Sequence, residues 1–108
     1  MGDAAGAVRR VTHWLLRYRF APDYLERRGA LRTEHLRLAW EAADEGTLIL
    51  GGAAGDPPDE GLLVFTTRAA AQAFAATDPY VAEGLVLDWT LNPWATVVGA
   101  LAATPVRA

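Results

Sequence analysis

The chain has 108 residues, an apolar fraction of 52% and a formal net charge of −3. This length supports one domain with a single core, and the acidic balance disfavours nucleic acid or an anionic membrane as a partner. The absence of cysteine excludes disulfides and thiolate chemistry, and two histidines are too few for a multi-histidine metal site. No apolar run reaches the ~18 residues of a membrane span and no signal peptide is visible, so we expect a cytoplasmic protein.

The first predicted element is a strand. Residues 1–10 show no periodicity and predict a flexible tail. Val11–Phe20 then alternates, which indicates a strand with one buried face. The expected buried side chains are Trp14, Leu16, Tyr18 and Phe20. Ala21-Pro-Asp23 breaks the strand, and Tyr24–Arg32 is predicted to connect it to a helix.

An amphipathic helix is predicted over Thr33–Glu45, with Thr33 as its N-cap and Gly46 as a left-handed C-cap. At about 100° per residue, one arc of this helix is apolar. The arc contains Leu36, Leu38, Ala39, Trp40, Ala42 and Ala43. His35 falls inside the arc, so its ring points toward the core. Two interpretations remain open: a core histidine satisfied by a hydrogen bond, or a general acid/base in a semi-buried pocket.

The second half of the chain predicts three strands and one longer helix. These are strands at Thr47–Leu50, Gly61–Thr67 and Leu85–Leu91, and a helix at Arg68–Thr77 capped by Thr66 or Thr67. Between the first two strands, Gly51-Gly52 permits close backbone approach, and residues 53–60 predict a surface loop. The last strand should place Leu85, Leu87, Trp89 and Leu91 on one face and Val86, Asp88 and Thr90 on the other. Residues 95–108 are either a final edge strand or a tail that contacts a partner.

The order β-α-β-β-α-β predicts an α+β, ferredoxin-like split fold: a four-stranded antiparallel sheet with two helices on one face. The uncovered face must be solvated or paired. Because the last strand lies beside the first in this fold, Asp88 should share that face with Arg17 and Arg19, together with Leu15, Val86 and Thr90. Such a face is too apolar for solvent alone and too charged for a core, so we predict a homodimer through it.

Several short motifs then carry a family resemblance over roughly Trp14 to Gly99. They are Leu25-Glu-Arg-Arg, Arg32-x-x-His35-Leu36, the Gly46 turn, Gly52, Phe65, Ala70-Ala71, Asp78-Pro79-Tyr80-Val81, Gly84 and Pro93-Trp94. In this order they resemble the YciI-like (YCII-related) family of the dimeric α/β-barrel superfamily. Arg-x-x-His-Leu together with Asp-Pro-Tyr is the more specific part. The corresponding domain is expected at 11–99, with a C-terminal tail at 100–108.

The resemblance implies a fold that dimerises through the open sheet face and a pocket in which His35 faces Asp78. Arg32 and Gly52 match positions near that pocket, and we assign them with Tyr80 to substrate binding. The family usually has a proline after the glycine, where this chain has Ala53, so the rim is expected to be looser. One branch resembles dehydrochlorinases of chlorinated hydroxyquinols, and relatives of the fold include lactone isomerases.

Each of these residues also has a structural interpretation. Asp78 before Pro79 is a standard N-cap for a short turn that Gly84 would close. Arg32 fits a solvated charge at a helix entry, and Tyr80 fits a packing residue. We keep both interpretations open, and one carboxylate at Asp78 can serve both roles.

The available residues favour proton transfer over acyl transfer, because the chain has no serine and therefore no Gly-x-Ser-x-Gly. A carboxylate would orient the imidazole while the ring takes a proton from a bound substrate, and Arg32 would neutralise a carboxylate or enolate. We therefore expect a small enzyme of lyase, isomerase or dehydrochlorinase type, needing no cofactor or metal, that acts on a small oxygenated molecule. The alternative is a non-catalytic ligand-binding or interaction module of the same fold.

Overall fold

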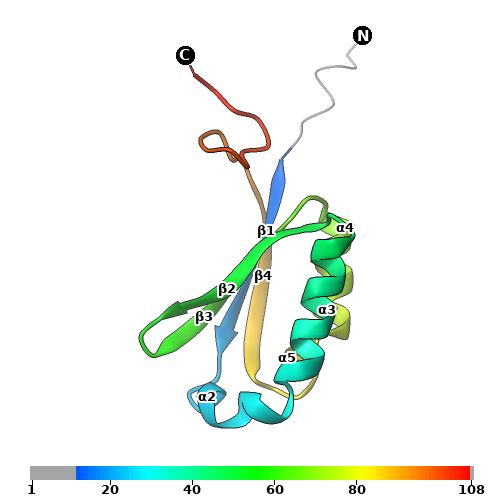
Figure 1. The fold of residues 1–108 in the computed structure, drawn as a ribbon. Coiled ribbons are helices and arrows are strands. Elements are labelled where there is room, and N and C mark those ends of the chain that lie inside the picture. The colour runs from blue at the N-terminus through cyan, green and yellow to red at the C-terminus, as the bar shows by residue number, and fades with distance from the viewer. Residues whose placement is uncertain (1–11, 108) are drawn as a thin grey trace.

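The computed structural model describes residues 12–107, so the predicted tail at 1–10 lies outside the described residues. The elements are β1 (His13–Phe20), α2 (Tyr24–Arg27), η1 (Arg28–Ala30), α3 (Arg32–Asp44), β2 (Leu48–Gly55), β3 (Pro58–Phe65), α4 (Arg68–Thr77), α5 (Pro79–Ala82) and β4 (Val86–Trp94). The strands form one antiparallel sheet in the order β2-β3-β1-β4. The longer helices α3 and α4 lie together on one side of it (Figure 1). The predicted ferredoxin-like α+β fold is confirmed. No helix within the described residues is long and apolar enough to cross a membrane.

The core lies between the sheet and the helices, where the alternation of β1 predicts it. Leu16, Tyr18 and Phe20 are buried on the helix side, and Arg17 and Arg19 are exposed on the other. The remaining core residues come from every layer of the fold; they include Tyr24, Leu48, Leu63, Phe65, Ala71, Phe74, Tyr80, Leu85 and Val86.

The start of α3 differs from the prediction. Thr33 is not the N-cap, because the short 3₁₀ turn η1 leads directly into α3 and Leu31 occupies the cap position without a side-chain hydrogen bond. The end of α3 matches expectation: Gly46 has a φ of 86°, the left-handed conformation that glycine adopts without strain. The predicted Thr67 cap of α4 is confirmed by its side chain, which accepts from the Ala70 amide at 3.1 Å.

Residues 53–60 are not the surface loop that the sequence predicts. β2 and β3 form one long hairpin that turns at residues 56–57, and Gly52 pairs with Leu62 while Ala54 pairs with Glu60. Glycine and alanine have low β-propensity, but the ladder with β3 supplies the hydrogen bonds that hold them extended. The hairpin diverges from the helices, as Figure 1 shows.

β4 also departs from its predicted alternation. Val86 is buried in the core rather than on the open face, because the register with β1 shifts between Arg19 and Phe20. Trp89, predicted to be buried, is 38% exposed. The strand continues past its predicted end through Pro93 to Trp94, which an edge strand tolerates since the missing N–H can face outward.

The open face of the sheet carries both ion pairs and apolar side chains. Arg19 pairs with Asp88, with Nε at 3.0 Å from Oδ2, so their predicted shared face is confirmed. Arg17 pairs with Glu60. Leu15 and Val64 lie on the same face, and Leu50 is 66% exposed beside them.

The C-terminal segment, residues 95–107, contains no strand, so the edge-strand interpretation is wrong for these residues. It projects beyond the end of the sheet (Figure 1). The Thr96 hydroxyl lies 2.8 Å from His13 Nδ1, so the start of this segment is hydrogen-bonded to β1. Val98 and Leu101 within it are exposed. A second hollow of about 500 Å³ separates this segment from Leu50 and Val64 of the open face.

Candidate functional site

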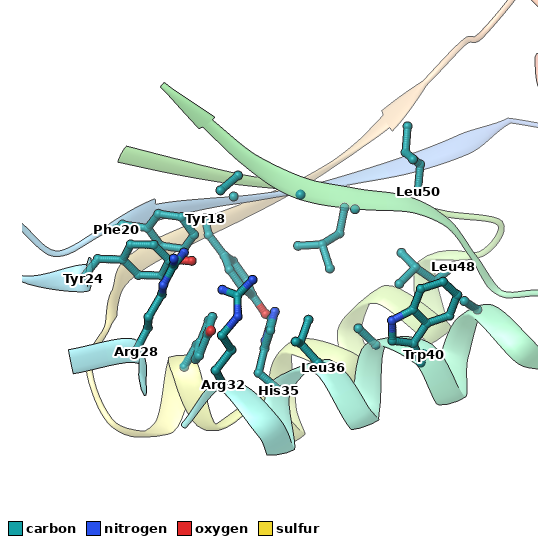
Figure 2. Close-up of a pocket in the computed structure, with 18 of the residues that line it drawn as sticks. Tyr18, Phe20, Tyr24, Arg28, Arg32, His35, Leu36, Trp40, Leu48 and Leu50 are labelled. Carbon is teal, nitrogen blue, oxygen red and sulfur yellow. The ribbon is translucent and has the colours of Figure 1, made fainter. Parts of the chain in front are cut away.

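A cleft of about 360 Å³ lies on the helix side of the sheet, between α3 and the β2–β3 hairpin. Its floor is aromatic and aliphatic, and its charged lining residues are Arg28 and Arg32 (Figure 2). The size is that of sites for small molecules. Leu36 and Trp40 of the predicted apolar arc are exposed here, 38% and 66%, because they face the cleft mouth rather than the core.

His35 enters the cleft from the first turns of α3 and contacts Asp78. Its Nδ1 lies 2.9 Å from Asp78 Oδ1 and 3.0 Å from Oδ2. The side chain of His35 is 15% exposed and that of Asp78 is fully buried. The predicted approach of these two side chains is confirmed; a catalytic role for them stays a prediction.

Asp78 is surrounded by hydrogen-bond donors. Tyr18 Oη donates to Oδ2 at 2.8 Å, and the Tyr80 amide donates to Oδ1 at 3.0 Å. The second of these bonds makes Asp78 the N-cap of α5, as its structural interpretation predicts. The same carboxylate therefore caps a helix and binds His35. A carboxylate surrounded in this way acts as an acceptor only, so the consistent assignment of His35 is the tautomer with a proton on Nδ1.

With Nδ1 on Asp78, the second ring nitrogen of His35 is left for the cleft. Nε2 has no hydrogen-bond partner among residues 12–107. The ring is held flat against Tyr80, with centroids 3.8 Å apart and planes 5° apart, and Phe74 meets it edge-on. Stacking and the carboxylate together fix the direction in which Nε2 points.

The environment of Tyr18 gives a prediction on alkaline stability. Burial, then the charge of Asp78 and the hydrogen bond to it, raise the pKa of Tyr18 above the ordinary tyrosine value. The stabilisation by its neutral hydroxyl is complete below about pH 10 and is lost as the pH rises further, because the unfolded chain releases the proton first. Urea unfolding at about pH 8 and about pH 11 should therefore show a smaller alkaline loss in Tyr18→Phe than in wild type.

The control is Thr47→Val, which removes a hydroxyl that donates to the Ala42 carbonyl and does not ionise in this pH range. Its alkaline loss should match that of wild type. Equal alkaline losses in wild type and Tyr18→Phe would contradict the assignment.

Comparison with known proteins identifies the family. The YCII-related domain matches residues 12–95, which is most of the chain and includes every residue of the His35–Asp78 cluster. The chain belongs to the YCII-related family. A search of curated proteins finds no match.

Two solved structures share the fold of this YCII-related domain. One is a 5-chloro-2-hydroxyhydroquinone dehydrochlorinase from Burkholderia phenoliruptrix AC1100, in complex with 2,5-dihydroxybenzoquinone: TM-score 0.63, 17% identity, covering 78% of this chain and 94% of that one. The other is a putative antibiotic biosynthesis monooxygenase from Bacteroides thetaiotaomicron. Its TM-score is 0.52 at 20% identity, and the match covers 83% of this chain and 92% of that one. At these identities the likeness establishes the fold alone.

The other assigned residues of the YCII-related domain also border the cleft. Arg32 is exposed at its mouth, Tyr80 forms part of the wall, and Gly52 contributes backbone. A β-carbon on Gly52 would meet no atom within 4 Å, so there is open space at this position of the lining. Within residues 12–107, no three potential metal ligands cluster.

Sequence reasoning missed two residues of the site. Tyr18 was expected only as a core residue, and its hydroxyl reaches Asp78 across 60 positions of sequence. Arg28 was predicted only as part of the Tyr24–Arg32 connector, yet it lines the cleft. Arg28 lies four residues before Arg32, a helical spacing that could have indicated a shared face for the two side chains. The 3₁₀ turn between them interrupts this periodicity.

Proposed function

We propose that the cleft binds a small, planar, oxygenated molecule and that His35 moves a proton on it, in a lyase- or isomerase-type reaction. The observation that carries this proposal is the Nε2 of His35, which has no hydrogen-bond partner in the described part of the chain while Nδ1 is held 2.9 Å from the buried carboxylate of Asp78. An imidazole oriented in this way accepts a proton at Nε2, and the carboxylate stabilises the imidazolium that forms.

The surroundings of His35 support a planar ligand. Tyr18, Phe20, Tyr24 and Tyr80 contribute rings to the cleft lining, and aliphatic side chains complete its apolar surface. Aromatic faces bind flat rings through stacking and edge contacts. The solved relative that is a dehydrochlorinase contains 2,5-dihydroxybenzoquinone, a molecule of this class. Loss of a proton to His35 with departure of chloride is one balanced reaction that the arrangement can catalyse.

A second candidate is a ligand-binding module without turnover. It is favoured by the role of Asp78 as N-cap of α5, which accounts for this residue without any catalysis. The two functions differ in one measurement, which is whether a bound ligand is changed.

The test is a panel of hydroxyquinols, 5-chloro-2-hydroxyhydroquinone and small lactones. Binding is measured by thermal shift, since a ligand that binds only the folded state raises apparent stability. Turnover is measured by chloride release and by deuterium exchange at acidic C–H positions in NMR. Binding with turnover supports the enzyme, and binding without turnover across the panel supports the module.

Turnover should also depend on pH. When the chemical step limits the rate, the rate should fall at acidic pH, because a protonated imidazole has no lone pair left to accept a proton at Nε2. The check is a profile of kcat against pH with a substrate from the panel. A rate that stays constant through the acidic range where imidazoles gain a proton would indicate a different base.

We also propose that the protein is a homodimer joined through the open sheet face. Leu50 and Trp94 are 66% and 47% exposed at this face, and a soluble monomer seldom leaves such side chains clustered. A partner would cover them and surround the Arg19–Asp88 pair. Apart from Leu50, the cleft lining belongs to the helix side of the sheet, so we expect assembly to leave the cleft mouth open.

Light scattering tests the dimer at micromolar concentration. Asp88→Ala should weaken assembly, because an arginine covered by a partner would lose its carboxylate. Glu41→Ala is the control, since Glu41 lies on α3 away from the open face. A stable monomer in wild type, or equal weakening by both variants, would refute the proposal.

A further inference from the structure

The cleft holds two positive charges and no carboxylate of its own. Its lining includes Arg28 and Arg32 but no aspartate or glutamate. Neither guanidinium forms an ion pair within residues 12–107. Arg17, Arg19 and Arg37, outside the cleft, each pair with a carboxylate. The cleft therefore carries positive charge that no ion pair among the described residues neutralises.

Arg28 is held in place by aromatic rings rather than by an anion. Its guanidinium carbon lies 5.5 Å from the centre of the Tyr24 ring, and that ring stacks on Phe20 at 3.8 Å. Such a contact positions a cation without neutralising it. Figure 2 shows Arg28 and Arg32 both reaching into the cleft from the helix side, with Arg32 beside His35.

A buried hydroxyl at the same end of the cleft has no hydrogen bond of good geometry within the part of the chain that the structure describes. Tyr80 is 1% exposed and its Oη has no hydrogen-bond partner of good geometry within residues 12–107, although Tyr24 and Arg32 are close enough to act on it. Burial of the side chain raises the pKa of Tyr80 most, and the neighbouring Tyr24 raises it further, whereas the positive charge of Arg32 lowers it. The hydroxyl is thus a neutral donor. An unpaired buried donor is unfavourable, and a ligand oxygen would satisfy it.

The start of α3 adds to the positive potential. Its N-cap, Leu31, offers no side-chain acceptor, so the first N–H groups of a 13-residue helix are left without a capping side chain. The positive end of the helix dipole lies there, next to Arg32. The guanidinium groups of Arg28 and Arg32, the Tyr80 hydroxyl and the N-terminus of α3 therefore all favour the binding of an anionic group.

We propose that the ligand of the cleft carries a carboxylate, bound by Arg28 and Arg32, with the Tyr80 hydroxyl as a further donor. A guanidinium matches the two oxygens of a carboxylate, and the apolar remainder of the lining suits a ring attached to it. This assignment rests on the proposed function in one respect: the same ligand presents its acidic proton to His35. The substrate class is therefore a small cyclic or aromatic carboxylate.

The test compares two compounds that differ only in charge, 2,5-dihydroxybenzoate and its uncharged carboxamide. Their dissociation constants are measured by NMR titration of the purified protein at low salt. Wild type should bind the carboxylate at least about tenfold more tightly, the effect of one charge-assisted hydrogen bond or more. Equal affinities, or no binding of either compound, would overturn the proposal.

Matched variants locate the effect. Arg28→Gln and Arg32→Gln should each reduce the preference for the carboxylate, and the double variant should bring it to about one, whereas Arg37→Gln on the outer face of α3 should leave it unchanged. Tyr80→Phe should weaken binding of the carboxylate without abolishing its preference. An equal loss in Arg37→Gln and Arg32→Gln would overturn the assignment, as would tighter binding of phenyl phosphate than of benzoate.

The His35→Gln variant separates this proposal from the proposed reaction. It should retain the charge preference, because His35 does not supply the charge. A preference for the carboxylate in wild type and His35→Gln, with no turnover in either, would refute the enzyme and support the carboxylate site. Turnover of neutral compounds with no charge preference would do the reverse.

Discussion

Replacing Asp78 with alanine should lower the free energy of unfolding by about 3–5 kcal/mol, the range for removing one partner from a buried, hydrogen-bonded charge cluster. The variant leaves the Tyr18 hydroxyl, the Tyr80 amide and His35 Nδ1 without their acceptor. It also removes the N-cap of α5, itself a contribution of about 1 kcal/mol. Urea unfolding followed by tryptophan fluorescence measures the loss.

Asp88→Ala is the matched control, because it removes a carboxylate that is paired but more than half exposed. Its urea midpoint, measured below the concentration at which chains associate, should stay close to that of wild type. Asp78→Asn should fall between the two, since an amide oxygen still caps α5 but the amide group cannot accept from every donor. Equal losses in Asp78→Ala and Asp88→Ala would show that the buried cluster contributes no more than a surface pair.

The second large effect is on catalysis. If His35 is the base, His35→Gln should lower kcat by about 10²- to 10⁴-fold, the usual contribution of a positioned general base. Glutamine keeps a polar group of similar length, so the KM should change only a few-fold and the fold should be retained. The measurement is steady-state turnover with whichever compound of the panel the wild type converts.

His13→Gln is the control for the same substitution, since His13 lies on β1 and bonds Thr96 far from the cleft. Its kcat should be close to that of wild type. A His35→Gln variant that keeps more than about a tenth of the wild-type kcat would argue against general-base catalysis, because one tenth corresponds to only ~1.4 kcal/mol of barrier.

Local patterns predicted the fold. The alternation in β1 identified the buried face, and the 100° periodicity of α3 placed His35 inward. Both signals follow from geometry that neighbouring residues share. The β2–β3 hairpin was missed because its residues 53–60 are glycine, alanine, proline and acidic side chains, which favour turns. Pairing with a partner strand overrode that local preference.

The candidate site was less accessible to sequence reasoning. The contact of His35 with Asp78 joins residues 43 apart, and it followed from a family resemblance rather than from any spacing. Neither the family resemblance nor any sequence spacing indicated the hydrogen bond from Tyr18 to the same carboxylate. Val86 was assigned to the wrong face because a single register shift beside Phe20 reverses the alternation, and a shift of this kind leaves no mark in the sequence.

Asp78 both caps α5 and binds His35, so this buried position is more constrained than the exposed positions around the cleft. Changing its carboxylate would remove the group that orients His35, the proposed base, and would weaken the domain at the same time, so few substitutions at this position are tolerable. Trp40, at the mouth of the cleft, is 66% exposed and Gly52 has open space around it, so substitutions there carry little structural penalty. New ligand preferences can accumulate at the rim of this cleft while its buried centre stays the same, which also makes the rim the natural target for a library of engineered variants.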